Sequence, residues 1–577
     1  MASLQDSFKE SGASYDKAVP PELTLARVRN LLERFDTPLV EEVRRIDSGR
    51  LGIPVYASRY SPFARGITGA HKQMGKGATP EQAEASAVME LVERFSVFSF
   101  AARPHNIQTL DELGEAAIPF EEILSSLPPG AFGQEAVLRL ISILSRIPLS
   151  WVPAYAPIQK KTVFLPWSWF WTINEYNGSA AGNTLEEAAV QALCEVVERH
   201  VSSLIAENGI RTPTIDPASI ENPVSRSLLE RYRSAGVHVV LKDFSLGMGI
   251  PTVGAIAWDP ATFPAMSEIV STAGTAPHPE RAAIRALTEV AQLAGDFDTD
   301  GSYMECGLPK YRTLEEAALL TETAVTVPIQ ELPSIDSMNF LIEIERAASA
   351  LAFQGLSTYV VDITHPGLGI PCAYVVIPGN RFRERTRDVD CISHAARLAC
   401  SCPNPVAASF LLEEFDAAFP GRPDIPYYRG LLHENSGDPL SALQWHRLAA
   451  SLTELPREKA RIFCNIGNCL RISGDFTEAE RALLTSIELD PGLKEAYNLL
   501  GYCRYRTGRH YEAIAAFEKA VSLDPGSGID YANIASNLRA LGLNGPAIHW
   551  YEMALELDPD IPWAREHLAE LLEKNES

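Results

Sequence analysis

A pattern of glutamates occurs twice in the first two thirds of the chain. Residues 77–95 and 182–200 align at a constant offset of 105, and nine of their nineteen positions are identical. Both segments carry small and apolar residues at helical spacing, which predicts helices. In each, two glutamates lie three residues apart, so both carboxylates share one helical face. Residues 278–292 form a weaker third copy, at an offset of 94 from the second.

Each predicted helix has polar side chains on one face. The three sets are Ser86, Glu90 and Glu93; Gln191, Glu195 and Glu198; and Arg285, Glu289 and Gln292. Apolar residues flank these faces, so the carboxylates are expected to be partly enclosed, and enclosed carboxylates are costly unless they are paired or bind cations. One such segment on its own would favour surface Glu–Arg pairs that stabilise little. Three copies favour a shared binding site.

The residue types on these faces suit a metal-bound phosphate ligand. Carboxylate oxygens are hard ligands, which suit Mg²⁺ better than zinc or copper. The segments contain no Glu-x-x-His pair, which argues against a di-iron carboxylate site. Arg94, Arg199 and Arg285 are interleaved with the acids, and a guanidinium matches the geometry of a phosphate group. Glutamates that hold Mg²⁺, with arginines beside them, would attract a nucleoside triphosphate.

A conventional nucleotide-binding loop is absent from the sequence. Residues 69–77 (GAHKQMGKG) look similar to one, but five residues separate the first two glycines, and Gly77 stands where Ser or Thr would bind Mg²⁺. Lys76 could still face a phosphate, and the helix start at residues 182–184 could offer backbone donors.

Several of these stretches together resemble the YcaO superfamily. The residues that carry the resemblance are 75–94, 177–199, 285–292 and 361–379, with 45–59 similar to the family's opening strand region. The resemblance spans about residues 40–385 in the expected order. It implies an ATP- and Mg²⁺-dependent enzyme that phosphorylates a backbone amide oxygen of a peptide or protein substrate, in cyclodehydration to an azoline or in thioamidation.

The resemblance also implies which residues bind the cofactors ATP and Mg²⁺. The implied Mg²⁺ ligands are Glu90, Glu93, Glu195, Glu198 and Glu289. The implied nucleotide-binding residues are these five together with Ser86, Asn183, Arg199 and Arg285. It assigns no catalytic base.

A second repeat, with a period of 34 residues, occupies the C-terminal third. The residues that keep this period are Gly474, Gly508 and Gly542; Ala479, Ala513 and Ala547; and Pro491, Pro525 and Pro559. Period and residue types are those of the tetratricopeptide repeat, which predicts paired helices. Gly430 and Gly437 mark a degenerate upstream unit, and they lie 37 residues before the corresponding glycines of the next unit. The repeats could dock a partner protein, pack on the enzyme, or mediate self-association as a homodimer.

The expected fold is an α+β YcaO-like core with antiparallel sheets and acidic helices that line an ATP cleft, followed by an all-α tetratricopeptide-type domain. The expected parts are an N-terminal extension (1–40), the catalytic domain (41–385), a linker (386–404) and the repeat domain (405–577). The short apolar runs 237–241 and 373–377 are expected to be buried strands. Trp167, Trp169 and Trp171 alternate at strand spacing, which predicts a strand with an aromatic face in the core.

Composition and charge exclude several classes of protein. The net charge of −24 over 577 residues argues against a nucleic acid partner. The sequence contains no apolar run of about 18 residues, which argues against a membrane span, and its polar N-terminus lacks a secretory signal. Nine scattered cysteines predict reduced thiols in a cytoplasmic protein. Cys391, His394, Cys400 and Cys402 are favoured as incidental residues over a zinc site, because one residue between the last two is too few.

Alternative functions remain open on the sequence. The chain ends in LAELLEKNES rather than in the proline-rich tail of many azoline-forming relatives. One alternative is an accessory factor for methylthiolation of ribosomal protein S12. Another is a non-catalytic adaptor that binds ATP and recruits a client through its repeats. A metal-dependent hydrolase that uses the same carboxylates is a weaker possibility, since the sequence has no His-rich site.

Overall fold

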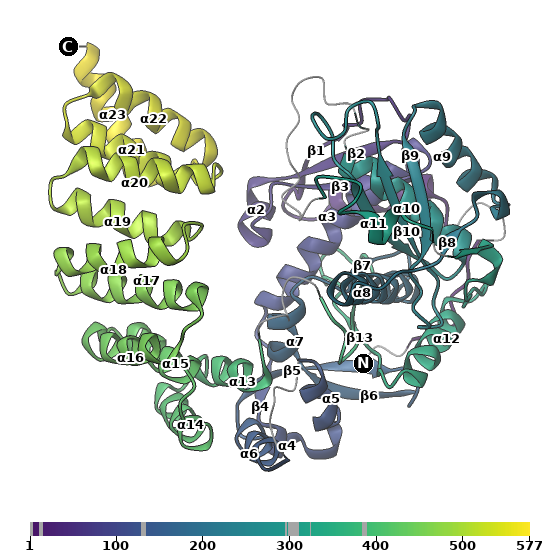
Figure 1. Ribbon diagram of the computed structural model, residues 1–577, viewed down its shortest axis with the longest axis horizontal. Helices are drawn as coiled ribbons and strands as arrows, with labels where there is room; N and C mark the ends of the chain where they lie inside the picture. Colours follow the sequence, from purple (N-terminus) through teal and green to yellow (C-terminus); the bar gives the residue numbers. More distant parts are fainter. Residues whose placement is uncertain are drawn as a thin grey trace. The chain divides into compact units, whose positions relative to one another are not determined.

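The computed structural model of the chain divides into two compact units. Unit 1 comprises Met1–Gly130 and Leu149–Cys391, and unit 2 comprises Ala131–Pro148 and Ile392–Ser577. The structure describes residues 4–10, 16–127, 134–294, 297, 311–323, 325–382 and 389–576 (Figure 1). Unit 1 has the predicted α+β fold, and unit 2 has the predicted all-α repeats.

Three sheets form the framework of unit 1. The first runs β1 (Val40–Arg45), β2 (Val55–Tyr60), β3 (Lys72–Lys76). The second runs β11 (Val270–Thr275), β10 (Thr252–Trp258), β9 (His238–Asp243), β8 (Thr214–Ile215), β12 (Thr326–Val327). The third runs β4 (Asn106–Gln108), β5 (Leu149–Ala156), β13 (Tyr359–Asp362), β14 (Cys372–Val376), β7 (Ser179–Ala181), with β6 (Lys161–Pro166) paired to β5. Strand pairs of the described residues are antiparallel except for β12 with β8, which confirms the predicted sheet type.

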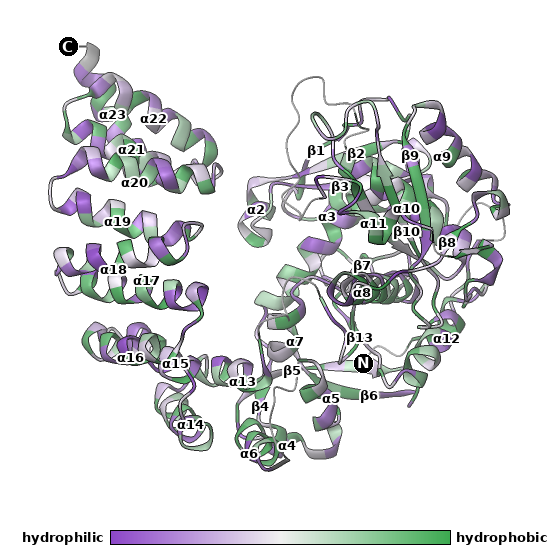
Figure 2. Cartoon of the chain, viewed as in Figure 1, coloured by the Kyte–Doolittle hydropathy of each residue, from purple (hydrophilic) through white to green (hydrophobic). Residues whose placement is uncertain are grey.

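Helices cover these sheets and enclose the core. The helices of unit 1 are α1 (Pro21–Arg34), α2 (Pro62–Thr68), α3 (Pro80–Ala102), α4 (Leu110–Leu113), α5 (Phe120–Ser125), α7 (Trp167–Asn174), α8 (Leu185–Asn208), α9 (Pro223–Ser234), α10 (Pro279–Ala294), α11 (Ala318–Thr321) and α12 (Phe340–Phe353). Figure 2 shows β10 in mostly hydrophobic colours and α9 in largely hydrophilic ones, as expected for a central strand and an outer helix. The predicted strands at 237–241 and 373–377 correspond to β9 and β14.

Each of the three glutamate-bearing helices follows a strand after a loop of equal length. The loops that join β3 to α3, β7 to α8 and β11 to α10 are residues 77–79, 182–184 and 276–278. Thr79 and Thr184 are the N-caps of α3 and α8, and their side chains accept hydrogen bonds from the backbone N–H groups of Gln82 and Glu187. The three sequence copies are therefore three strand–loop–helix units.

Glycine allows the first and third of these strands to approach their helices closely. A Cβ atom at Gly75 would lie 2.0 Å from the backbone N of Ala87, and one at Gly274 would lie 2.5 Å from the backbone N of Ala286. The two contacts are equivalent in the aligned copies, and Ala180 stands at the same position in the second copy. Part of the repeated pattern of small residues therefore reflects packing of strand on helix rather than ligand binding.

The predicted strand at the tryptophans is wrong, because this segment forms helix α7. Strand β6 ends at Pro166, which has no N–H to continue the ladder, and the helix begins at the next residue. Trp167 and Trp171 are then one helical turn apart, and their rings stack with centroids 5.4 Å apart. Trp169 is fully buried, and its Nε1 donates to Ser126 Oγ over 2.7 Å. The expectation that these rings serve the core holds for Trp167 and Trp169.

The described residues of the expected N-terminal extension (1–40) pack on other parts of unit 1. Lys9 is buried, and its Nζ lies 2.9 Å from Asp336 Oδ1 and 2.5 Å from Glu343 Oε1. Its charge therefore fixes the segment to α12 and to the loop before it. Helix α1 packs against α3, so residues far ahead of the first acidic helix reach its surroundings.

The helices of unit 2 form the predicted repeats. They are α6 (Gln134–Leu144), α13 (Cys391–Cys400), α14 (Pro405–Ala418), α15 (Asp424–Asn435), α16 (Pro439–Leu452), α17 (Pro456–Ile472), α18 (Phe476–Leu489), α19 (Lys494–Arg506), α20 (His510–Leu523), α21 (Gly528–Ala540), α22 (Asn544–Leu557) and α23 (Pro562–Glu576). The repeated alanines Ala479, Ala513 and Ala547 are fully buried, and the turn glycines Gly474, Gly508 and Gly542 have positive φ angles. Helix α13 lies within the segment expected to be a linker, and α6 packs on α14 within unit 2. Within the described ranges, no helix combines the length and the apolar character that crossing a membrane requires.

Candidate functional site

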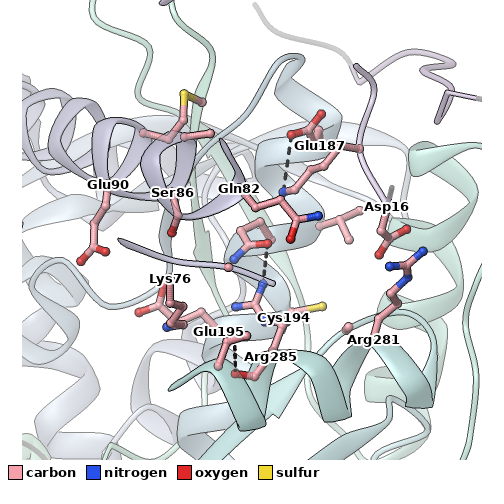
Figure 3. A pocket seen from close by; sticks show the side chains of 18 of the residues that line it. Asp16, Lys76, Gln82, Ser86, Glu90, Glu187, Cys194, Glu195, Arg281 and Arg285 are labelled. Carbon is pink, nitrogen blue, oxygen red and sulfur yellow. Dashed lines mark hydrogen bonds and ion pairs between the residues drawn. The ribbon is translucent and has the colours of Figure 1, made fainter. Parts of the chain in front are cut away.

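A pocket of about 420 Å³ lies in unit 1, where α3, α8 and α10 converge (Figure 3). The three glutamate-bearing faces predicted from the sequence therefore meet in space. The lining includes all nine predicted site residues, which are Ser86, Glu90, Glu93, Asn183, Glu195, Glu198, Arg199, Arg285 and Glu289.

Charged side chains of the pocket hold one another in place. Glu93 Oε1 accepts hydrogen bonds from Arg94 Nη1 at 2.6 Å and from Ser179 Oγ at 2.7 Å. On the second helix, Arg199 Nε donates to Glu195 Oε1 over 3.0 Å. On the third, Arg285 Nη1 donates to Gln191 Oε1 over 2.7 Å. The arginines thus occupy fixed positions beside the carboxylates, with donors left for a ligand.

Lys76, at the end of β3, lies among the glutamates of all three helices. Its Nζ forms an ion pair with Glu289, and the charges of Glu90, Glu195 and Glu198 also act on it. Burial lowers the pKa of Lys76 to about 8, and the nearby Arg285 charge adds to this effect. The segment that superficially resembles a nucleotide loop thus contributes a lysine to the pocket through a strand.

The carboxylates of the pocket are poorly solvated. Burial raises the pKa of Glu93 to about 8 against the opposing charge of Arg94. Burial likewise raises the pKa values of Glu90 and Glu198, although neighbouring basic groups oppose it. Because burial disfavours the charged form of these carboxylates, a bound cation would stabilise that form.

The donor and acceptor atoms of the pocket fit a metal-bound phosphate ligand. The lining contains seven carboxylates and six basic side chains, so both signs of charge are close together. Gln292 Oε1 and Arg285 Nε are buried and lack hydrogen-bond partners among the described residues. An unpaired carbonyl-type oxygen suits a hard cation, and an unpaired guanidinium N–H suits a phosphate oxygen. The residues present therefore fit Mg²⁺ and a nucleoside triphosphate.

Comparison with known proteins assigns the chain to a protein family. The family model described as YcaO cyclodehydratase, ATP- and Mg²⁺-binding, matches residues 74–381, more than half of the chain. The chain belongs to the YcaO family. A tetratricopeptide repeat model matches residues 467–528.

The YcaO protein described here is similar to proteins from archaea and bacteria. An uncharacterized protein of Methanothermobacter thermautotrophicus is 30% identical over 388 residues, which are 63% of this chain and 95% of that protein. The ribosomal protein S12 methylthiotransferase accessory factor YcaO of Escherichia coli is 24% identical over 337 residues, which are 53% of this chain and 56% of that protein.

Solved structures with a similar fold include a heterocyclase in complex with substrate and cofactor. It has 25% identity and a TM-score of 0.54, over 66% of this chain and 54% of that chain. The YcaO protein of Methanopyrus kandleri bound with AMPPCP and Mg²⁺ has 25% identity and a TM-score of 0.48, over 65% of this chain and 95% of that chain. This YcaO chain thus spans about half the length of the heterocyclase.

Sequence reasoning missed the N-terminal wall of the pocket. Asp16 and Lys17 line the pocket, and Figure 3 shows Asp16 opposite Arg281 of α10. Thr24 Oγ1 donates to Asn183 Oδ1 over 3.1 Å, so helix α1 orients the predicted site asparagine. No local pattern in this YcaO sequence marks Lys17 and Thr24, because their partners Glu187 and Asn183 lie more than 150 positions away.

Two of the cysteines near residue 400 donate hydrogen bonds to backbone oxygens. Cys391 Sγ donates to the backbone oxygen of Leu124 over 3.2 Å, and Cys400 Sγ donates to that of Tyr428 over 3.3 Å. Within the part of the chain that the structure describes, neither belongs to a group of converging metal-ligand atoms.

His200 follows Arg199 on α8 and anchors the segment after β14. Its Nδ1 accepts a hydrogen bond from the backbone N of Arg381 over 2.9 Å. Burial lowers the pKa of His200 to about 4, and the charge of Arg381 adds to this effect. Below the unfolded pKa of about 6.5 the unfolded chain binds a proton that the folded chain does not. The contribution of His200 to stability is therefore present above about pH 6.5 and lost as the pH falls towards 4.

We expect urea unfolding of unit 1 to show this loss. Between about pH 7 and about pH 5 the free energy of unfolding should fall by about 2 kcal/mol more in the wild-type chain than in His200→Gln. The matched control is His71→Gln, because His71 is exposed. Equal pH dependence in wild type and His200→Gln would contradict the assignment.

Proposed function

We propose that this YcaO protein uses ATP and Mg²⁺ to phosphorylate a backbone amide oxygen of a peptide or protein. The observation that carries the proposal is the convergence of three acidic helix faces on one pocket, with basic side chains between them. Membership in a family described as ATP- and Mg²⁺-binding supports it.

Each group of residues has a proposed role in the pocket. Glu90, Glu93, Glu195, Glu198 and Glu289 would hold Mg²⁺. When bound, Mg²⁺ neutralises charge on the triphosphate and makes its terminal phosphorus more electrophilic. Arg199 and Arg285 would orient phosphate oxygens, and Lys76 would add charge beside them. Ser86 and Asn183 would position the nucleotide, with α1 holding Asn183 in place.

Amide phosphorylation makes a poor leaving group into a good one. The amide oxygen forms a bond to the terminal phosphorus, and the bond between that phosphorus and ADP breaks. If a neighbouring Cys, Ser or Thr of the substrate closes onto the carbonyl carbon, loss of phosphate gives an azoline. If an external sulfur nucleophile adds instead, loss of phosphate gives a thioamide. Both routes use the same phosphorylated amide, so one pocket serves either.

One structural relative supports a substrate that is bound together with the cofactor. The heterocyclase with the similar fold is described in complex with its substrate and cofactor. The repeats of unit 2 offer a further surface for the substrate or for a partner protein, which is a common use of such repeats.

Mass spectrometry of proteins from cells with and without this chain tests the proposal. Cyclodehydration predicts a product that has lost one water, and thioamidation predicts one oxygen replaced by sulfur. Cells that carry Glu90→Gln should lack the product. An adaptor or accessory role predicts instead that no amide is modified even in cells with the wild-type chain; that outcome would refute the enzymatic proposal.

A further inference from the structure

A second group of metal-ligand atoms lies inside the repeats of unit 2. Glu434 of α15, His446 of α16 and Cys469 of α17 place one ligand atom each within 4.8 Å of the others. Glu434 Oε1 is 2.6 Å from His446 Nε2 and 3.4 Å from Cys469 Sγ. Asn465 Nδ2 also donates to this oxygen, over 3.1 Å. Three consecutive helices thus direct three different ligand types at one point.

The histidine stands where the regular repeats have an apolar or aromatic residue. The equivalent residues of the next three repeats are Leu483, Phe517 and Tyr551. Leu483 comes 37 residues after His446, and the other two follow at intervals of 34. His446 packs against Gly430, and a Cβ atom added to Gly430 would lie 2.4 Å from the imidazole ring. Leu483 packs against Gly467 in the same way. An imidazole is costlier to bury than a hydrocarbon or phenol unless it gains a specific partner. The repeat therefore loses its ordinary core residue at the place where a glutamate and a cysteine converge.

The cluster is almost completely enclosed. His446 and Cys469 are fully buried, and 14% of the Glu434 side chain is exposed. His446 Nδ1 has no hydrogen-bond partner among the described residues. Metals bind the uncharged form of an imidazole, through either ring nitrogen.

We propose that Glu434, His446 and Cys469 form a zinc site that ties α15, α16 and α17 together. A carboxylate and a thiolate balance the two charges of Zn²⁺, and the fourth position is left for Asn465 or water. The thiol proton leaves to solvent, and the ring proton moves from Nε2 to Nδ1. The unpaired Nδ1–H is a smaller penalty than the free energy of zinc binding at sites of this kind.

The spacing of the ligand atoms agrees with tetrahedral zinc after a small adjustment. Neighbouring ligand atoms around such a zinc lie roughly 3.3–3.7 Å apart. The distance between Cys469 Sγ and Glu434 Oε1 is already 3.4 Å, and the His446–Glu434 distance of 2.6 Å needs to widen by about 1 Å or less. Zinc binding would displace the thiol proton of Cys469, so the affinity for zinc should fall with decreasing pH.

Co²⁺ titration of the metal-free full-length protein tests the site, because thiolate-bound Co²⁺ has a charge-transfer absorption that oxygen ligands do not give. We expect one equivalent of Co²⁺ to produce this band and Zn²⁺ to remove it. Cys469→Ser should abolish the band. The matched control is Cys503→Ser, because Cys503 is the buried cysteine one repeat later and belongs to no converging ligand group among the described residues.

One further variant keeps the result interpretable. If Cys469→Ser does not fold by circular dichroism, Glu434→Gln replaces it and should weaken Co²⁺ binding at least about tenfold. A band that persists in Cys469→Ser would assign it to another cysteine, such as Cys194 in the pocket of unit 1. That outcome, or a wild-type protein without any thiolate band, overturns the proposal.

Discussion

Glu90→Gln is expected to lower ATP turnover by about 100-fold or more while the protein keeps its fold. The amide has the shape of the carboxylate but lacks the charge that a hard cation requires. Glu90 lies on the pocket face of α3, where burial raises its pKa, so loss of this charge should not destabilise the folded chain. Turnover is measured by phosphate release in the presence of substrate, and fold by thermal melting.

Glu81→Gln is the matched control for this variant. Glu81 is on the same helix but exposed, outside the pocket. Its replacement removes a first-turn carboxylate, which costs about 0.3–1 kcal/mol of stability and leaves turnover unchanged. Equal turnover in Glu90→Gln and Glu81→Gln would remove Glu90 from the site.

Gly75→Val is expected to destabilise unit 1 by about 3 kcal/mol or more. The first added carbon would lie 2.0 Å from Ala87 N and 2.5 Å from Ala83 O, both backbone atoms of α3. Backbone cannot move aside as a side-chain end can, so β3 and α3 must separate. Hydrogen exchange of α3 amides should accelerate, and nucleotide binding should weaken because Lys76 and Glu90 move apart.

Gly66→Ala controls for the loss of a glycine. Gly66 lies inside helix α2, and an added Cβ atom there would meet nothing within 4 Å. Alanine is the better helix former, so this variant should be stabilised by about 0.5–1 kcal/mol. Exchange rates in Gly75→Val no faster than in Gly66→Ala would show that the strand and helix are not packed as described.

The acidic helices could be predicted because their signals are local. Thr79 and Thr184 mark helix starts, and the spacing of Glu90 and Glu93 puts both on one face. Their convergence followed from the repetition of the pattern, since three copies of a costly face are best explained by one shared ligand. The same repetition also has a packing cause that the sequence does not separate, as the Gly75 contact with α3 shows.

Other features of the fold depend on contacts that local patterns do not encode. The spacing of Trp167, Trp169 and Trp171 fits both a strand and one turn of a helix, and Pro166 decides between them by ending the strand. Asp16, in the pocket lining, forms an ion pair with Lys9, and Lys9 is in turn buried against Glu343, more than 330 residues further along the chain. Helix α6 lies between strands of unit 1 in sequence but packs on α14, since its apolar face finds its partner there.

The most direct test of the account is calorimetric titration of the full chain with a non-hydrolysable ATP analogue, with Mg²⁺ and with a chelator in its place. We expect saturable binding with Mg²⁺ and a loss of affinity of at least about 100-fold in the chelator, because the carboxylates repel a triphosphate that lacks its cation. Glu90→Gln should reduce the Mg²⁺-dependent part. Equal affinity with and without Mg²⁺, or no binding at all, would contradict the assignment of the pocket.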